Sequence, residues 1–161
     1  MRSFTRIVRI ALFSETYLPQ RNGVANTLAR LVDYLSRAGH ELLVAAPADS
    51  AEDPVATHPN VRLVRVPGMP LPRYPDLRLA TPMSPTILRA TQAFRPDLVH
   101  LVTEYSLGLT GLAAARRARV PAVASFHTDI PSYLPYYGFG WLSRPCWSYL
   151  RWFHGKARFT F

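Results

Sequence analysis

Residues 7–13, Ile7-Val8-Arg9-Ile10-Ala11-Leu12-Phe13, are apolar and rich in β-branched side chains, which is typical of a buried strand. A polar loop with Pro19 and Gly23 follows. Apolar residues then recur at three- and four-residue steps, which predicts an amphipathic helix: Val24, Leu28, Leu31, Val32 and Leu35. Gly39 stands where a helix C-terminal cap is expected. This order of strand, loop and helix predicts the first unit of an α/β fold.

The same alternation continues along the chain. Short apolar runs predict strands at 41–46, 61–66, 97–102 and 121–126, and 157–161 begins another strand-like run. Helical patterns are expected from Ser84-Pro85 to just before Pro96, over 106–117 and over about 143–153. The strict alternation within 61–66 favours a place near a sheet edge. Strands that alternate with helices predict a Rossmann-like, mostly parallel sheet with helices on both faces.

Residues 67–85 form an exception to this pattern, because they contain six prolines. Proline lacks a backbone N–H and fixes φ, so it disfavours both helix and sheet interiors. We therefore expect a long loop here and no regular structure. Long loops inside compact domains often carry function.

Composition and length narrow the class of protein. The chain has 161 residues, of which 48% are hydrophobic, so residues 1–161 are expected to form a single domain with a packed core. Its one cysteine, Cys146, excludes an internal disulfide framework and a cysteine-based metal cluster. The five histidines do not show metal-ligand spacing, so no metal site is expected. The start of the chain does not fit a signal peptide, which favours a cytoplasmic protein.

The net charge of +9 comes mostly from arginines scattered along the chain. The segment after Asp129 differs, because it has no acidic residue and holds all three tryptophans, Trp141, Trp147 and Trp152. A basic, aromatic segment suits peripheral contact of residues 139–161 with an anionic membrane surface. A helix that packs its aromatic side chains on a neighbour missing from these 161 residues explains the same pattern equally well. Nucleic-acid binding is disfavoured, because the arginines are dispersed and no recognition motif is present.

In parallel α/β sheets, ligands bind beyond the carboxyl ends of the strands. The loops after Phe13, Val102 and Phe126 should therefore share one crevice. These loops bring together the candidate polar and aromatic side chains: Tyr17, Asn22, Gly23, Glu104, Tyr105, His127, Thr128 and Asp129.

Three positions in this crevice have a chemical interpretation. Asn22-Gly23 leads into a helix N-terminus, where free N–H groups favour an anion, although a plain turn glycine fits as well. His127 can exchange protons near neutral pH or hydrogen-bond a substrate hydroxyl. Glu104 can bind hydroxyl groups or cap the following helix. No pattern assigns a role to His58 or His154. The glycine motifs of dinucleotide-binding and P-loop proteins are absent.

Two segments together resemble glycosyltransferase family 4, whose members have the GT-B architecture. They are RIALFSETYLPQRNGVANTLARLVDYLSRAGHELLVAAP (residues 9–47) and PDLVHLVTEYSLGLTGLAAARRARVPAVASFHTDIPSYLPYYG (residues 96–138). Within the family, the chain looks most like GDP-mannose-dependent α-mannosyltransferases that act on lipid or glycolipid acceptors. Related glucosyl- and sulfoquinovosyl-lipid synthases share similar motifs.

The resemblance implies a retaining hexosyltransferase that needs no metal or cofactor, with a nucleotide sugar, most readily GDP-mannose, as donor. His127 matches the family's active-site histidine, and Asn22-Gly23 matches the loop that faces the phosphate and sugar of the donor. The resemblance places the remaining predicted residues in the acceptor cleft, with Tyr133 and Tyr137 at its mouth. They are Tyr17, Glu104, Thr128, Asp129, Tyr133 and Tyr137.

One departure from the family is that the nucleotide-binding C-terminal domain is absent from these 161 residues. The resemblance therefore implies an N-terminal, acceptor-side domain that is inactive alone and requires that second domain, in cis or in trans. A different class stays open. A lone α/β binding module could dock on a membrane or a partner protein through its aromatic C-terminal segment.

Overall fold

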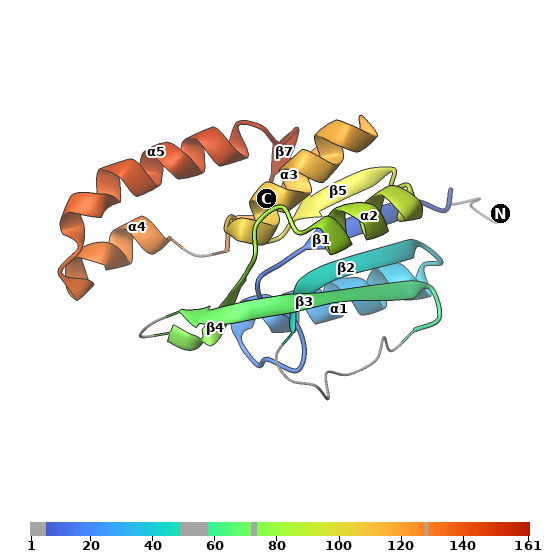
Figure 1. Ribbon diagram of the computed structural model, residues 1–161, viewed down its shortest axis with the longest axis horizontal. Coiled ribbons are helices and arrows are strands. Elements are labelled where there is room, and N and C mark those ends of the chain that lie inside the picture. Colours follow the sequence, from blue (N-terminus) through green and yellow to red (C-terminus); the bar gives the residue numbers. More distant parts are fainter. Residues whose placement is uncertain (1–5, 49–57, 72–73, 128) are drawn as a thin grey trace.

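The computed structural model describes residues 6–48, 58–71, 74–127 and 129–161. Seven strands of these residues form one sheet in the order β4-β3-β2-β1-β5-β6-β7 (Figure 1). The strands are β1 (Arg9–Phe13), β2 (Glu41–Ala48), β3 (Val61–Leu71), β4 (Tyr74–Ala80), β5 (Leu98–Leu101), β6 (Ala122–Ala124) and β7 (Phe159–Thr160). The helices are α1 (Gly23–Arg37), α2 (Pro85–Phe94), α3 (Ser106–Ala118), α4 (Ile130–Tyr133) and α5 (Ser143–His154), with short 3₁₀ turns η1 (Leu134–Tyr137) and η2 (Gly140–Leu142).

The sheet is parallel except at one edge. β1 pairs in parallel with β2 on one side and with β5 on the other, and only β3 and β4 are antiparallel. The chain thus builds outward from β1 in one direction and then returns to build in the other. This reversal between β1 and β5 is the topological switch point of a doubly wound fold. The predicted Rossmann-like, mostly parallel sheet is confirmed.

Helices cover both faces of the sheet, as predicted. On one face α1 packs Leu28 and Val32 against Leu12 of β1 and Val44 of β2. On the other face a larger cluster joins α2 and α3 to the same strands through their alternate side chains. Phe153 of α5 belongs to this second cluster and is fully buried. Each central strand is therefore apolar on both sides, because both of its faces are buried.

The prediction of a long loop over residues 67–85, made from their six prolines, is wrong, because most of these residues form strands. β3 runs on to Leu71, and β4 returns antiparallel beside it as the edge strand. β3 pairs with β2 only as far as Pro67, so Pro70 lies where the strand has a neighbour on one side only. A proline without a donor is tolerated at such a position. The register shifts between Pro70 and Leu71, which marks the local irregularity.

The C-terminal part forms an arm of short helices beside the sheet (Figure 1). α4, η1 and η2 lead into α5, and the chain then returns to pair β7 in parallel with β6. The predicted helix at about 143–153 and the strand-like run at 157–161 are both confirmed. None of the described helices is long and apolar enough to cross a membrane.

Gly108 of α3 is a tight packing position. A Cβ there would lie 2.2 Å from the carbonyl oxygen of Thr103 and 2.9 Å from Cζ of Phe153. Gly108→Ala should therefore destabilise the fold by about 1–3 kcal/mol, because α3 must move away from the β5 loop and α5. Urea unfolding of both proteins measures the difference. Gly23→Ala is the matched control, since a Cβ at Gly23 meets nothing within 4 Å; equal losses in the two variants would contradict the prediction.

Candidate functional site

The carboxyl ends of β1, β5 and β6 bring three loops together at one edge of the sheet. Backbone hydrogen bonds continue past the strands, from Val102 N–H to Phe13 O at 2.9 Å and from Ser125 N–H to Leu101 O at 2.9 Å. The loop residues that follow each strand therefore start side by side. The three loops thus leave the sheet at the switch point, where ligands bind in folds of this kind, and the shared crevice stays a prediction.

Glu15, which sequence analysis did not single out, is the central polar residue of this edge. Its side chain is fully buried. One carboxyl oxygen accepts hydrogen bonds from Leu107 N–H at 2.5 Å and Ser106 Oγ at 2.6 Å, and the other accepts from Thr103 Oγ1 at 2.6 Å. The carboxyl group of the first loop thus caps the N-terminus of α3, where free N–H groups and the helix dipole favour a negative charge.

Burial raises the pKa of Glu15, and the hydrogen bonds from Ser106, Thr103 and Leu107 act in the opposite direction. These donors replace part of the hydrogen bonds to water that the carboxyl group loses on burial. No local pattern could have revealed this role, because the partners of Glu15 lie about 90 residues away. Only the pairing of β1 with β5 brings them to it.

Glu104, a predicted acceptor-binding residue, lies beneath α5. Its carboxyl oxygen is 3.3 Å from Nε2 of His154, and its carbonyl oxygen accepts a hydrogen bond from the hydroxyl of Tyr149. Burial, with a smaller contribution from the charge of Glu15, raises the pKa of Glu104 to about 7. Burial also lowers the pKa of His154. The sequence assigned no role to His154. In the structure it contacts Glu104, which lies 50 residues earlier in the chain.

Asn22 and Gly23 begin α1 as the sequence predicted. Asn22 Oδ1 accepts from Ala25 N–H at 2.9 Å, and its Nδ2 donates to Thr16 Oγ1 at 2.6 Å. The side chain of Asn22 thus holds the loop, and Gly23 is exposed. Tyr17 belongs to the same loop, between β1 and α1. Its ring is buried in the core beside α1, with the Arg65 guanidinium 5.7 Å above it.

His127 is exposed just beyond β6. Burial of part of the ring lowers its pKa, and its charge helps burial to lower the pKa of His100 to about 4. Asp129 is used as a helix cap, because its carboxylate accepts from Ser132 N–H at 3.3 Å and Ser132 Oγ at 2.6 Å. Thr128 lies outside the described residues.

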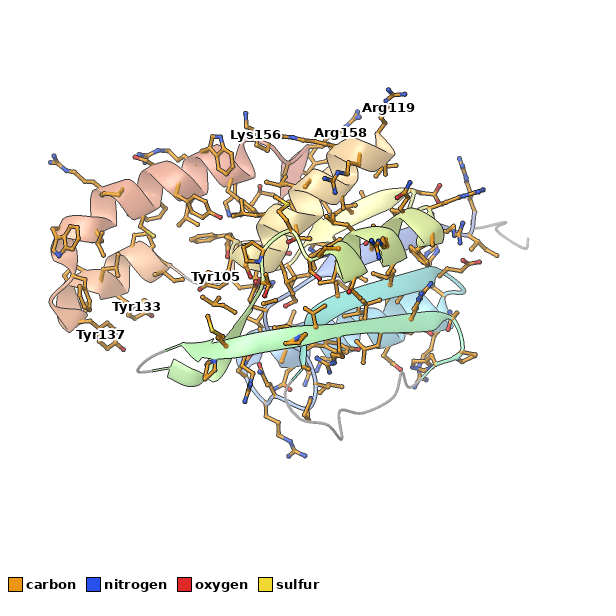
Figure 2. The ribbon with its side chains drawn as sticks, in the orientation of Figure 1. Tyr105, Arg119, Tyr133, Tyr137, Lys156 and Arg158 are labelled. Atoms are coloured by element: carbon orange, nitrogen blue, oxygen red, sulfur yellow. The ribbon has the colours of Figure 1, made fainter. Side chains whose placement is uncertain are left out.

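The predicted residues divide into two groups in space. Asn22, Glu104 and His127 belong to the three loops at the edge of the sheet. Tyr133 and Tyr137 are exposed on the α4–η1 arm, away from Tyr105 beside the sheet (Figure 2). The tyrosines would thus meet only a ligand that extends beyond the loops.

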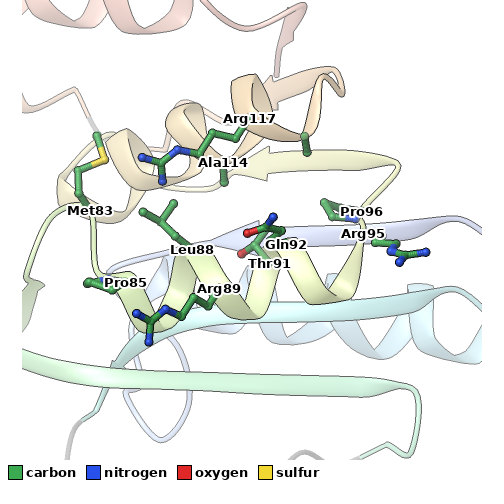
Figure 3. A pocket seen from close by; sticks show the side chains of 11 residues that line it. Met83, Pro85, Leu88, Arg89, Thr91, Gln92, Arg95, Pro96, Ala114 and Arg117 are labelled. Atoms are coloured by element: carbon green, nitrogen blue, oxygen red, sulfur yellow. The ribbon is translucent and has the colours of Figure 1, made fainter.

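A hollow of about 790 Å³ lies elsewhere, between α2 and α3 (Figure 3). Arg89 and Arg117 stand on either side of Leu88 in this groove. None of the predicted site residues lines it. Over residues 6–48, 58–71, 74–127 and 129–161, no three His, Cys, Asp or Glu side chains gather to hold a metal ion.

The family model described as Glycosyltransferase Family 4 matches residues 21–161. The chain belongs to this family. The match covers most of the chain, including α1 and the loops after β5 and β6, and it confirms the resemblance seen in the sequence.

Curated relatives refine this assignment. The chain is 41% identical to the GDP-mannose-dependent alpha-mannosyltransferase of Mycolicibacterium smegmatis, over 93% of this chain and 40% of that protein. It is 32% identical to the alpha-monoglucosyldiacylglycerol synthase of Streptococcus pneumoniae, over 86% of this chain and 31% of that protein. A structure of Anabaena HepE in complex with UDP-glucose is 21% identical, with a TM-score of 0.49, over 76% of this chain and 30% of that one. The chain thus spans 31–40% of the length of these two curated relatives.

The Glu104 carboxyl group should make stability depend on pH. Its folded pKa of about 7 lies above the ordinary value of 4.5, so the folded state holds an extra proton between these pH values. Stability should therefore fall as pH rises from about 4.5 to 7, by about 3 kcal/mol in total. Glu104→Gln removes the titrating group and should remove most of this slope. Urea unfolding at a series of pH values measures it.

Glu41→Gln is the matched control for this experiment. The Glu41 carboxylate is half-exposed and pairs with Arg9 at 3.0 Å on the surface. This variant should keep the slope of the wild-type protein. A slope that survives in Glu104→Gln would show that the buried carboxyl group titrates at its ordinary pKa.

Proposed function

We propose that this chain is the acceptor-side domain of a retaining, metal-independent glycosyltransferase that moves a hexose from a nucleotide sugar to a lipid or glycolipid. Mannose, supplied as GDP-mannose, is the proposed sugar. A second domain, which would bind the nucleotide, completes the proposed active site. The isolated 161 residues should therefore show no turnover.

The observation that supports the proposal is that the loops after β1, β5 and β6 leave the sheet side by side. Gly23, the first residue of α1, is exposed, and a Cβ there would meet nothing within 4 Å. His127 is exposed just beyond the end of β6. A helix N-terminus offers N–H donors to a phosphate group. An exposed histidine at the end of β6 is suited to hydrogen-bond a sugar hydroxyl or to move a proton.

The relatives support the choice of donor and acceptor. The chain shares 41% identity with a protein named as a GDP-mannose-dependent alpha-mannosyltransferase. Its relatives also include the alpha-monoglucosyldiacylglycerol synthase of Streptococcus pneumoniae, which favours a lipid acceptor for this protein too. Exposed Tyr133 and Tyr137 suit such an acceptor, because aromatic rings stack on sugars and cover acyl chains.

Peripheral contact of residues 139–161 with the inner face of the membrane is part of this proposal. Trp141 is 74% exposed and Trp152 is 47% exposed, and basic side chains stand between and after them. Exposed indole rings beside arginines suit the headgroup region of an anionic bilayer. The other side of α5 is held to the core by Leu150 and Phe153, so the segment can present its aromatic side chains without unfolding.

Removal of the two exposed indole rings tests this contact. Trp141→Ala/Trp152→Ala should weaken binding to vesicles that contain phosphatidylglycerol by about tenfold, because apolar area is lost from the interface. Vesicle co-sedimentation measures the change. Tyr34→Ala, on the exposed face of α1, is the control and should bind as the wild-type protein does. Equal binding by all three proteins would remove residues 139–161 from the contact.

His127→Ala tests the proposed reaction. Placed in a two-domain protein that contains this chain, it should lower kcat about 10²–10⁴-fold, as the loss of a positioned proton-transfer group does. Mannosyl transfer from radiolabelled GDP-mannose to a lipid extract measures the rate, and circular dichroism checks the fold. His58→Ala is the control, since His58 only pairs with Asp33 at the surface. A normal rate in His127→Ala would remove His127 from the mechanism.

A further inference from the structure

A basic hollow lies at the opposite end of the sheet from the candidate site. It has a volume of about 470 Å³ and contains the amino end of β6, at Pro121 and Ala122. The three loops of the candidate site leave the carboxyl ends of the strands, so the proposed transfer reaction does not use this hollow.

Four exposed cations line the basic hollow: Arg116, Arg119, Lys156 and Arg158. Two come from the end of α3 and two from the turn between α5 and β7. Figure 2 shows Arg119 and Arg158 at the same edge of the molecule and Lys156 at the end of α5. Lys156 is also the only lysine in the chain.

The two segments are held together by the backbone. Arg158 N–H donates to the carbonyl oxygen of Ala122 at 2.7 Å, which fixes the α5–β7 turn against β6. Arg119 has a left-handed φ of 57° and ends α3 with its N–H bonded to Arg116 O at 3.2 Å. The cations are therefore brought together by the fold and not by one flexible segment.

No carboxylate balances these charges. The lining of the basic hollow contains no Asp or Glu, and in the described part of the chain none of its four cations forms an ion pair. The carbonyl ends of α3 and α5 attract cations near their last turns, but this attraction is screened and limited to the helix end. Four like charges around one hollow repel one another, and a bound anion removes that repulsion.

The chemistry of the lining selects the kind of anion. Arginine binds phosphate oxygens through two parallel N–H donors, and lysine binds them as a point charge. The other lining side chains are small or apolar, Leu112 and Val120 among them, so the four cations supply the charged groups of the hollow. We propose that the basic hollow is a binding site for a phosphate-bearing anion, separate from the site of glycosyl transfer.

Binding of a free phosphate is tested with inorganic pyrophosphate and the purified protein. Calorimetry should show binding that weakens with added salt, and the melting temperature should rise with ligand concentration. Arg119→Glu/Lys156→Glu should bind about tenfold more weakly or not at all. Arg30→Glu/Arg62→Glu is the matched control, because it makes the same change of net charge at exposed positions of α1 and β3.

A second arm asks whether a lipid carries the phosphate. The same three proteins are sedimented with phosphatidylcholine vesicles, with or without phosphatidylglycerol. Selective loss of pyrophosphate binding by Arg119→Glu/Lys156→Glu supports the site, and selective loss of vesicle binding as well shows that a lipid can carry the phosphate. Selective loss in the vesicle arm alone assigns these cations to the membrane contact and overturns the proposal. Equal behaviour of the two double variants in both arms overturns the proposal. Neither arm measures glycosyl transfer, and the pyrophosphate arm is also independent of the membrane contact proposed for residues 139–161, which include Lys156. The pyrophosphate arm therefore tests the site whether or not the proposed function holds.

Discussion

The hydrogen bonds of Glu15 fix the geometry of the candidate site. A fully buried carboxyl group is costly to remove from water, and here the cost is offset by donors from Thr103, Ser106 and Leu107. These bonds tie the loop after β1 to the loop after β5 and to the N-terminus of α3. Asn22 then holds the other end of the first loop through Thr16 and Ala25. The exposed parts of the site, Gly23 and His127, rest on this buried polar frame.

α5 is fixed by a second set of polar contacts. Glu104 is bound by Tyr149 through its backbone and by His154 through its side chain, and Phe153 fills the space that Gly108 leaves open. One side of α5 is thereby committed to the core. Its remaining aromatic side chains, Trp147 and Trp152 among them, stay partly exposed. One side of the segment thus packs on its own domain while aromatic surface stays exposed, and both interpretations of that surface, contact with a membrane and packing on a further neighbour, stay predictions.

Much of the fold could be predicted because the signals were local. The apolar periods of α1 and the central strands, and the Ser84-Pro85 start of α2, are properties of neighbouring residues. The hairpin of β3 and β4 could not be predicted, since whether a proline is tolerated depends on which strand lies beside it. In the candidate site, the sequence predicted that Asn22 leads into a helix and that Asp129 lies in a loop; it did not predict the short helix α4 that begins after Asp129. Their side chains proved to cap helices, which their position alone did not reveal.

The sequence by itself determined the class of fold and the family, and it predicted the three loops that form the candidate site. These follow from apolar periodicity and from motifs whose residues are close together in the chain. Only the tertiary structure decided that Glu15 caps α3, that His154 meets Glu104 and that four cations surround the basic hollow. Each of these depends on the tertiary fold, which brings together residues 37 to 92 positions apart. A local pattern cannot encode such contacts, because nothing near either partner in the chain records the other.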